Sequence, residues 1–311
     1  MDISKKTIDR EIEKVLTGKP KKLYDAANHI SSAGGKRLRP ILCLLACESL
    51  NGKTNNALKS AISLELMHTF SLIHDDIMDH DELRRNVKTV HVLYGEPTAI
   101  LAGDLLFSKA FELCDPKATK ILAHASVDLC EGQELDMEFE ERTFVSEREY
   151  VEMIKKKTAS LFEASTAMGA VLAGGSEKQV RAFSEYGQNL GMAFQIYDDL
   201  LDLLADEKKL GKPVFSDIAE GKKTLIVVRA MESLRGMERD RLAKLLHKTK
   251  KSKKETDEIF KLLKESGAIE YAKQKSRGYI NNAKKSLEKI PDSKAKDELL
   301  RIADFVVERE F

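Results

Sequence analysis

Apolar residues recur along most of the chain at intervals of three and four positions. Leu58, Ile62 and Leu66 follow this spacing, and so do the apolar residues of the segment 183–194. In a helix such residues share one face. Stretches of alternating β-branched residues, which would predict strands, are nearly absent. The pattern therefore predicts an all-α protein.

Glycine and proline divide this pattern into segments of moderate length. These interruptions fall at residues 34–35, 51–52, 95–97, 115–116, 174–175, 211–213, 221 and 291. Because glycine and proline mark turns, we expect helices joined by short loops. No change in composition is long enough to be a linker, so we expect one domain over residues 1–311. The basic run 247–254 is interpreted as a solvated loop.

Composition and charge exclude several classes of protein. Hydrophobic residues make up 42% and charged residues 33%, which is typical of a folded soluble domain. The net charge of +1 predicts no general attraction to nucleic acid. The four cysteines, Cys43, Cys47, Cys114 and Cys130, show no paired spacing for zinc or a disulfide framework. The charged start lacks the apolar core of a signal peptide, and no run is long enough to span a bilayer. We expect a reduced, cytoplasmic protein.

The sequence contains two acidic motifs of the form DDxxD, at residues 75–79 and 198–202, each within an apolar run. On a helix, Asp75 and Asp79 lie on one face with Cβ atoms about 5–6 Å apart. Carboxylates this close repel by about 4 kcal/mol in a semi-buried setting. Such clusters favour a cation, and ligands that are all oxygen suit Mg²⁺. One motif alone is as consistent with a solvated face, but two favour Mg²⁺ ions that clamp a diphosphate.

Basic residues near these motifs supply positive charge for a diphosphate. The segment 34–40, GGKRLRP, joins two glycines to a dense basic cluster, and Arg84 and Arg85 follow the first motif. Arginine suits bidentate contact with phosphate, and lysine acts as a point charge. Further basic positions are Lys157 (followed by Thr158), Lys212 and Lys222-Lys223. His68 lies two helical turns before Asp75, where it is either a core residue or a phosphate contact.

Together these motifs resemble those of the trans-isoprenyl diphosphate synthases. The matching segments follow one another as GGKRLRP, ELMHTFSLIHDDIMDHDELRR, KKKT, FQIYDDLLD and GKPVFSDIAEGKKT. They extend from Gly34 to Thr224 without a departure at a position expected to be functional. The resemblance implies a single bundle of roughly ten or more helices around a deep central cavity. It also implies a homodimer.

The resemblance assigns a role to each matching residue. The implied Mg²⁺ ligands are Asp75, Asp79 and Asp198, supported by Asp76, Asp199 and Asp202. The implied pocket for isopentenyl diphosphate contains Lys36, Arg39, His68 and Arg85. The implied site for the allylic diphosphate contains Arg84, Lys157, Thr158, Gln195, Lys212 and Lys222. In catalysis, the oxygens of Thr158 and Gln195 would face the developing carbocation.

The implied reaction is Mg²⁺-dependent, head-to-tail condensation of isopentenyl diphosphate with dimethylallyl, geranyl or farnesyl diphosphate. It proceeds by ionisation of the allylic substrate, condensation and loss of a proton. No residue of the chain needs to act as a covalent nucleophile.

Residues before the first motif are expected to line the cavity and to set the length of the product. At 1.5 Å per residue, Phe70 lies about 7.5 Å and Met67 about 12 Å from Asp75 along the helix. An aromatic residue five positions before the motif, followed by the small Ser71, resembles synthases that stop at geranylgeranyl diphosphate (C20). The alternatives are a C15 or longer product, with Phe70 acting only as a core residue.

Three other classes of protein share part of this pattern. A terpene cyclase uses similar aspartates but does not need the GGKRLRP cluster. An HD-type phosphohydrolase would match the dipeptides at 74–75 and 80–81, but it needs several clustered histidines. A non-catalytic partner subunit is expected to lose an aspartate motif, and both are intact. We therefore expect an enzyme.

Overall fold

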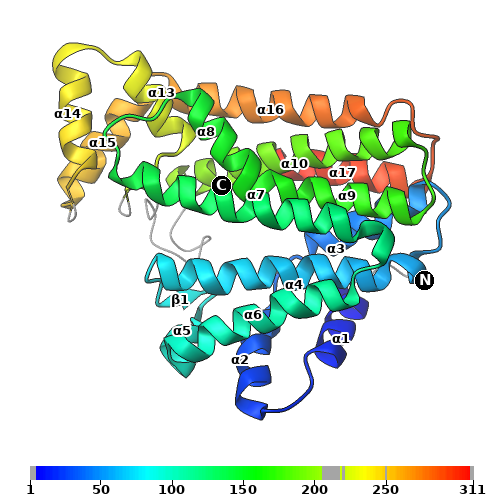
Figure 1. Cartoon of the computed structure of the whole chain (residues 1–311). Coiled ribbons are helices and arrows are strands. Elements are labelled where there is room, and N and C mark those ends of the chain that lie inside the picture. The colour runs from blue at the N-terminus through cyan, green and yellow to red at the C-terminus, as the bar shows by residue number, and fades with distance from the viewer. Residues whose placement is uncertain (1–4, 205–217, 219–220, 249–250, 309–311) are drawn as a thin grey trace. The chain divides into compact units, whose positions relative to one another are not determined.

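The computed structural model describes residues 5–204, 218, 221–248 and 251–308. Nearly all the regular structure in these residues is helical (Figure 1). The exception is a two-stranded antiparallel ribbon of β1 (Leu83–Arg84) and β2 (Val87–Lys88), in which Leu83 pairs with Lys88. The prediction of an all-α protein is confirmed.

The chain forms two compact units, each made of three separate segments. The first contains Met1–Val127, Leu161–Gly187 and Ser286–Leu300, and the second contains Asp128–Ser160, Gln188–Lys285 and Arg301–Phe311. The single domain over residues 1–311 stays a prediction.

Four of the seven helices that the structure describes in the amino-terminal half end near predicted interruptions, and those that end at residues 15, 78 and 141 do not. The seven helices are α1 (Lys5–Val15), α2 (Lys21–Ser32), α3 (Leu38–Ser49), α4 (Thr54–Met78), α5 (Val90–Tyr94), α6 (Glu96–Leu113) and α7 (Pro116–Glu141). Gly95, with a φ of 84°, separates α5 from α6, and Pro116 begins α7. Glycine tolerates this positive φ, and proline fits the first turn of a helix.

The carboxyl-terminal half is also helical. Its elements are α8 (Glu147–Ile154), the π-helix η1 (Lys155–Ala159), α9 (Ser160–Leu172), α10 (Glu177–Leu204), α13 (Leu225–Ser233), α14 (Gly236–Leu246), α15 (Lys253–Glu265), α16 (Ala268–Ser286) and α17 (Lys294–Glu308). No helix in the described part of the chain is both long and apolar enough to cross a membrane.

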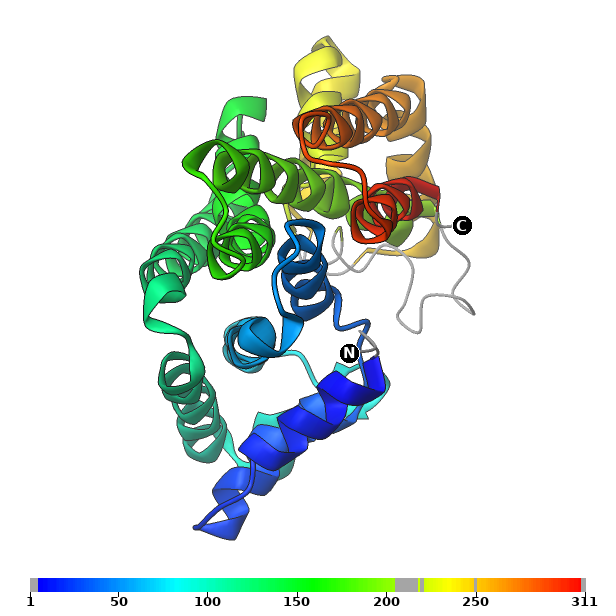
Figure 2. The same cartoon turned by 90° about the vertical axis from the view of Figure 1, so that its right-hand side faces the viewer.

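The long helix α4 is the centre of the first unit. Figure 2 looks along α4 and shows α3 beside it, and α6 packs on α4 as well. Leu64, Leu66 and Met67 of α4 are completely buried, although they point in different directions around the helix. A helix that is apolar on several faces is held by its neighbours. The first aspartate motif, at the end of α4, is therefore attached to the best-packed element of this unit.

In the second unit, α10 and α13 supply much of the core. Ile196 and Leu200 of α10 are fully buried in the same apolar cluster as Leu225 of α13. Leu242 of α14 and Ile259 of α15 complete this cluster from the other helices. The second aspartate motif lies on α10 between these buried residues, so its backbone position is fixed by packing.

Candidate active site

The first aspartate motif occupies the carboxyl-terminal end of α4. Asp75 and Asp76 lie in its last turn, and Asp79 caps the helix with its N–H donating to the carbonyl of Asp75 at 2.8 Å. A helix carries partial negative charge at this end, and no basic residue lies in the last turn of α4. Three carboxylates in this place are electrostatically unfavourable unless a positive group compensates them.

Asp76 shows this need for a cation most clearly. The carboxylate is buried, and its Oδ1 accepts a hydrogen bond from Arg84. Its Oδ2 is also buried and receives no hydrogen bond from any described residue. Burial raises the pKa of Asp76 to about 7, against the opposing effect of Arg84. An oxygen with lone pairs and no donor fits a hard cation or a water bound to one.

Arg84 is the positive group that compensates this motif in the structure. Its guanidinium forms an ion pair with Asp76 and lies 3.8 Å from a carboxylate oxygen of Asp75 and 3.4 Å from one of Asp81. The predicted role of Arg84 in binding the allylic diphosphate would require it to exchange some of these partners for phosphate oxygens.

The residues predicted to bind isopentenyl diphosphate gather around His68. The pKa of His68 is lowered well below its usual value by burial and then by the positive charges of Arg39, Arg85, Arg84 and Arg37. The imidazole is therefore neutral, because four guanidinium groups already concentrate positive charge near it. Such a concentration of positive charge favours the binding of an anion.

Arg39 and Arg85, two of these guanidinium groups, have different contacts. The Arg39 guanidinium lies 4.6 Å from the ring centroid of Phe162, and its buried Nε finds no acceptor among the described residues. Burial lowers the pKa of Arg39 to about 10, so the group stays charged at neutral pH. Arg85 donates to the carbonyls of Ile30, at 3.1 Å, and Gly34. Lys36 is exposed in the loop that precedes α3.

Arg37 differs from its neighbours because it is used inside the protein. It is buried and forms ion pairs with Glu65 at 2.8 Å and Asp9 at 2.7 Å. Gly35, with a φ of 138°, makes room for this arrangement, since a Cβ there would lie 2.9 Å from Nη1 of both Arg37 and Arg85. Gly35 therefore lets two arginines approach the backbone closely.

In the second unit, the π-helix η1 presents Lys157 and Thr158. A π-helical turn widens the helix, is rare and often marks a functional site. Lys157 Nζ pairs with a carboxylate oxygen of Asp136 on α7 at 2.5 Å. Gly132 of α7 lies against the backbone of Lys157, where a Cβ would come within 2.2 Å of its nitrogen. The position of η1 thus depends on a glycine in the facing helix.

A chain of hydrogen bonds connects η1 to the second aspartate motif. Thr158 Oγ1 donates to Gln195 Oε1 at 2.7 Å, and Gln195 Nε2 donates to Asp199 Oδ1 at 2.9 Å. Tyr150 of α8 donates its hydroxyl proton to Asp199 Oδ2 at 2.7 Å. Burial and the nearby Asp199 raise the pKa of Tyr150 well above its usual value, so it remains a donor. The chain fixes which way the Gln195 amide points.

The three carboxylates of the second motif have different surroundings. Asp198 is exposed, whereas Asp199 and Asp202 are buried. Asp199 accepts the hydrogen bonds from Tyr150 and Gln195, so it positions the side chain of Gln195. Lys222 is half-buried just before α13, and Lys212 lies outside the described residues. The metal-binding roles of Asp198, Asp199 and Asp202 stay predictions.

The residues predicted to set product length lie on α4 among aromatic side chains. The Phe70 ring is 4.8 Å from that of His74 and 5.2 Å from that of Phe107 on α6, measured between centroids. Met67 is completely buried, and the half-buried Ser71 donates its hydroxyl proton to the His68 carbonyl at 2.8 Å. These contacts are compatible with both roles considered for Phe70, as a core residue and as the residue that closes the end of a cavity.

Several residues in these clusters were not predicted from the sequence. Tyr150 donates a hydrogen bond to Asp199, and Asp136 forms an ion pair with Lys157. Gln133 lies one turn before Asp136 on α7. Gln133 is buried, and its Nε2 has no acceptor among the described residues. The sequence holds no distinct signal for these α7 residues, because Glu131, Glu134 and Glu138 make this part of α7 largely polar.

A metal ion at either motif would need ligands other than protein side chains. No group of three or more His, Cys, Asp or Glu side chains is placed to hold a metal among the described residues. Mg²⁺ binds through one or two carboxylates and completes its shell with waters and phosphate oxygens. The all-oxygen motifs and the unsatisfied oxygen of Asp76 fit this kind of coordination.

Comparisons with known proteins agree with these features. A family model described as polyprenyl synthetase matches residues 20–263. The short chain isoprenyl diphosphate synthase of Methanothermobacter thermautotrophicus is 47% identical over 100% of this chain and 98% of its own length. The geranylgeranyl pyrophosphate synthase of Geoglobus acetivorans is 45% identical over 98% of this chain and 97% of its own.

Solved structures give the same result. The crystal structure of geranylgeranyl pyrophosphate synthetase from Pyrococcus horikoshii is similar with a TM-score of 0.93 and 45% identity, over 98% of this chain and 96% of that one. The match extends across the helices that carry both aspartate motifs. The prediction made from the motifs is confirmed: the chain belongs to the polyprenyl synthetase family of prenyl-transferring enzymes.

Proposed function

We propose that this chain is a Mg²⁺-dependent prenyltransferase that condenses isopentenyl diphosphate with dimethylallyl, geranyl and farnesyl diphosphates to give geranylgeranyl diphosphate. One observation carries the proposal. Arg84 pairs with Asp76 of the first motif, and its charge also acts on His68 among Arg39 and Arg85. A place for a cation and a place for a diphosphate therefore adjoin within the first unit.

The residues of the chain would divide the work as follows. Asp75, Asp79 and Asp198 would hold Mg²⁺, which when bound would neutralise the charge that develops on the leaving diphosphate. The allylic diphosphate would be oriented by Arg84, Lys157, Lys212 and Lys222, and isopentenyl diphosphate by Lys36, Arg39, His68 and Arg85. We propose that both aspartate motifs serve the same diphosphate in the working enzyme.

Gln195 and Thr158 would stabilise positive charge on the allylic carbon. Their oxygens are hydrogen-bonded to each other, and Gln195 donates to the carboxylate of Asp199. Preorganised dipoles and a nearby carboxylate favour a developing cation without rearrangement during the reaction. The hydroxyl of Tyr150 would act as a positioning group, because it contacts Asp199.

We propose C20 as the main product on the basis of Phe70. Its ring lies against Phe107 and next to the small Ser71, on the helix that leads away from the first motif. A C15 product, or one longer than C20, is the alternative.

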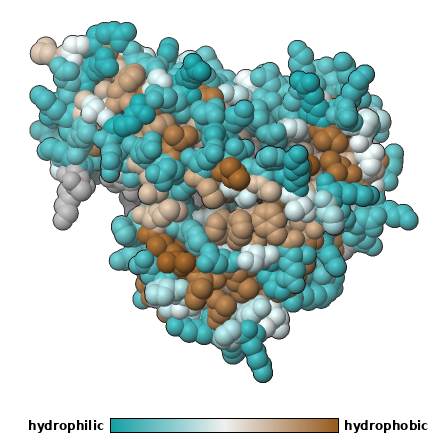
Figure 3. Space-filling view, in the orientation of Figure 1, coloured by the Kyte–Doolittle hydropathy of each residue, from teal (hydrophilic) through white to brown (hydrophobic). Residues whose placement is uncertain are grey.

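We propose further that the enzyme acts as a homodimer in the cytoplasm. Leu93 of α5 and Leu101 of α6 are 49% and 57% exposed, and Val127 of α7 is 55% exposed. Figure 3 shows apolar residues gathered over the region where Figure 1 draws α5 and α6. Exposed apolar patches often mark protein interfaces. Light scattering on a size-exclusion column should give twice the chain mass, and a Leu101→Glu variant should lower it.

The activity is tested with purified protein, labelled isopentenyl diphosphate, Mg²⁺ and each allylic primer, followed by analysis of product length. The proposal predicts that isopentenyl diphosphate is consumed with every primer up to farnesyl diphosphate and that C20 accumulates. Cyclised products made without isopentenyl diphosphate would identify a terpene cyclase. Lack of turnover with any primer would favour a partner subunit.

A further inference from the structure

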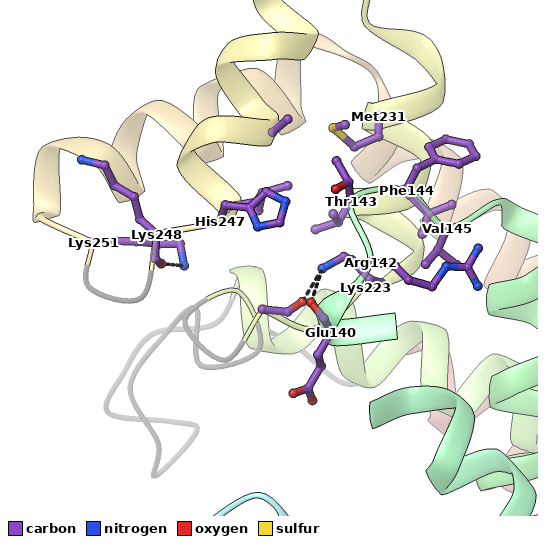
Figure 4. Close-up of a pocket in the computed structure, with 15 residues that line it drawn as sticks. Glu140, Arg142, Thr143, Phe144, Val145, Lys223, Met231, His247, Lys248 and Lys251 are labelled. Atoms are coloured by element: carbon purple, nitrogen blue, oxygen red, sulfur yellow. Dashed lines mark hydrogen bonds between the residues drawn. The ribbon is translucent and has the colours of Figure 1, made fainter. Parts of the chain in front are cut away.

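The second unit contains a cavity of about 180 Å³ that the proposed reaction does not use. It is lined by Glu140 at the end of α7, by residues 142–145, by α13 with the residues before it, and by the end of α14 with the residues after it (Figure 4). Of the described residues that line it, only Lys223 was considered above as a source of positive charge for a diphosphate, and none is a residue to which the resemblance assigns a substrate or metal role. The cavity therefore needs an explanation of its own.

One side of the cavity is apolar. Val227, Val228 and Met231 of α13 contribute to it, with Ala243 and Leu246 of α14. The three α13 residues also belong to the core cluster of this unit, so this wall is rigidly held. An apolar group of a ligand that packs against this side would contribute about 25 cal/mol for each Å² of apolar surface that leaves water.

The other side is basic, and two of its lysines have no carboxylate partner among the ion pairs of the described chain. Lys223 Nζ donates to the carbonyls of Gly221 at 2.9 Å and Glu140 at 3.3 Å. Lys251 Nζ donates to the carbonyls of Lys248 at 2.7 Å and Ile218 at 3.0 Å. An ammonium group has three donors, so each lysine retains one that it can offer to a ligand.

The charged neighbours of these lysines are largely engaged elsewhere. Arg142 pairs with Glu149, and Lys248 pairs with Glu255. Figure 4 shows the Glu140 carboxylate turned away from the Lys223 ammonium. Burial lowers the pKa of Lys223, the charge of Lys251 lowers it further, and that of Glu140 opposes the change. The two ammonium groups repel each other, and an anion between them would stabilise the charged form of both.

We propose that this cavity binds an amphiphilic anion, a phosphate or diphosphate joined to a short apolar chain. The anionic group would contact Lys223 and Lys251, and the chain would lie against Val228 and Met231. A cavity smaller than those that take drug-sized ligands, of about 300–1,000 Å³, suits a short chain. A short prenyl diphosphate has both parts. The inference does not depend on the proposed function, because it requires only binding.

The absence of tryptophan from the chain gives a direct test. Phe144 lines the cavity and is 41% exposed, so Phe144→Trp places a single fluorescent reporter there with little disturbance. Full-length protein is titrated with geranyl diphosphate in EDTA, which keeps metal-dependent binding from contributing. The expected result is a saturable change in fluorescence. Inorganic diphosphate and geraniol should each bind about tenfold more weakly, because each lacks one half of the ligand.

A matched pair of variants tests the basic side. In the reporter background, Lys251→Gln should weaken binding about tenfold, since it removes one charge-assisted hydrogen bond. Lys253→Gln, an exposed lysine two residues away that does not line the cavity, should leave binding unchanged. Ala243→Leu should fill the apolar side and also weaken binding.

Several results would overturn the proposal. They are the absence of a fluorescence change with geranyl diphosphate, and equal affinities in the Lys251 and Lys253 variants. Inorganic diphosphate that binds as tightly as geranyl diphosphate would show an anion site without an apolar part. A stronger response to vesicles of phosphatidic acid than to geranyl diphosphate would assign the site to a lipid headgroup instead.

Discussion

Replacement of Tyr150 by phenylalanine tests whether the buried hydrogen-bond chain positions Gln195. The change removes one hydroxyl and leaves the ring, which is 1% exposed, in place. The lost bond is the 2.7 Å donation to Asp199 Oδ2. Asp199 would keep the donor from Gln195 but would be free to turn. We therefore expect effects on both stability and rate.

The size of the effect follows from the kind of bond. A buried hydrogen bond to a charged group contributes about 1.5–3 kcal/mol to the free energy of unfolding. For a chain of this size each kcal/mol shifts the melting temperature by about 2–4 °C, so we expect a decrease of about 3–12 °C. A misplaced Gln195 should lower kcat by about tenfold to a hundredfold, with a smaller change in KM.

Tyr186→Phe is the matched control. Tyr186 is also completely buried, and its hydroxyl donates to the backbone carbonyl of Leu299 at 2.6 Å. Its loss should cost about 1 kcal/mol of stability and leave kcat unchanged. Thermal unfolding and steady-state kinetics with isopentenyl diphosphate and farnesyl diphosphate measure both quantities. If kcat of Tyr150→Phe matches that of Tyr186→Phe, the positioning role of Tyr150 is wrong.

Three further changes test the other parts of the account. Gly132→Ala should abolish most activity by displacing η1. The control is Gly278→Ala, whose added Cβ meets nothing within 4 Å, and it should keep activity and gain about 0.4–1 kcal/mol of stability. Full activity of both variants would contradict the role of Gly132. Phe70→Ala should give products longer than C20 and Ser71→Phe shorter ones in chromatography of the products, and an unchanged spectrum in both would remove the cavity-floor role. Arg39→Gln should raise KM for isopentenyl diphosphate about tenfold to a hundredfold and leave KM for the allylic primer unaltered. An equal rise for both substrates would argue against a separate pocket.

Periodic patterns and local spacing could predict the helices and the two motifs. The apolar residues around Asp75 and Asp76 predict the helix α4 on which they lie. Asp75 and Asp79 are four positions apart, and residues four apart on one helix share a face. The basic cluster at 34–40 was likewise visible, because the charges are adjacent in the sequence. These features depend on neighbours in the chain, which a sequence displays directly.

Features that depend on distant partners could not be predicted. Arg37 belongs to the basic cluster but faces the protein interior, because it pairs with Glu65. Glu65 lies 28 positions away in the sequence. Tyr150 is 49 positions from the carboxylate it holds, and nothing in its local sequence marks it. The π-helical turn at Lys157 likewise requires close approach by Gly132 of another helix. Tertiary packing decides all three.

The proposed reaction requires both aspartate motifs to bind metal ions on one diphosphate. Crystals grown with Mn²⁺ and a non-cleavable geranyl thiolodiphosphate would test this requirement through the anomalous scattering of the metal. We expect metal peaks about 2.0–2.2 Å from carboxylate oxygens of Asp75, Asp79 and Asp198, all coordinated to the same diphosphate. Metal bound at only one motif, or a diphosphate that touches no metal, would contradict it.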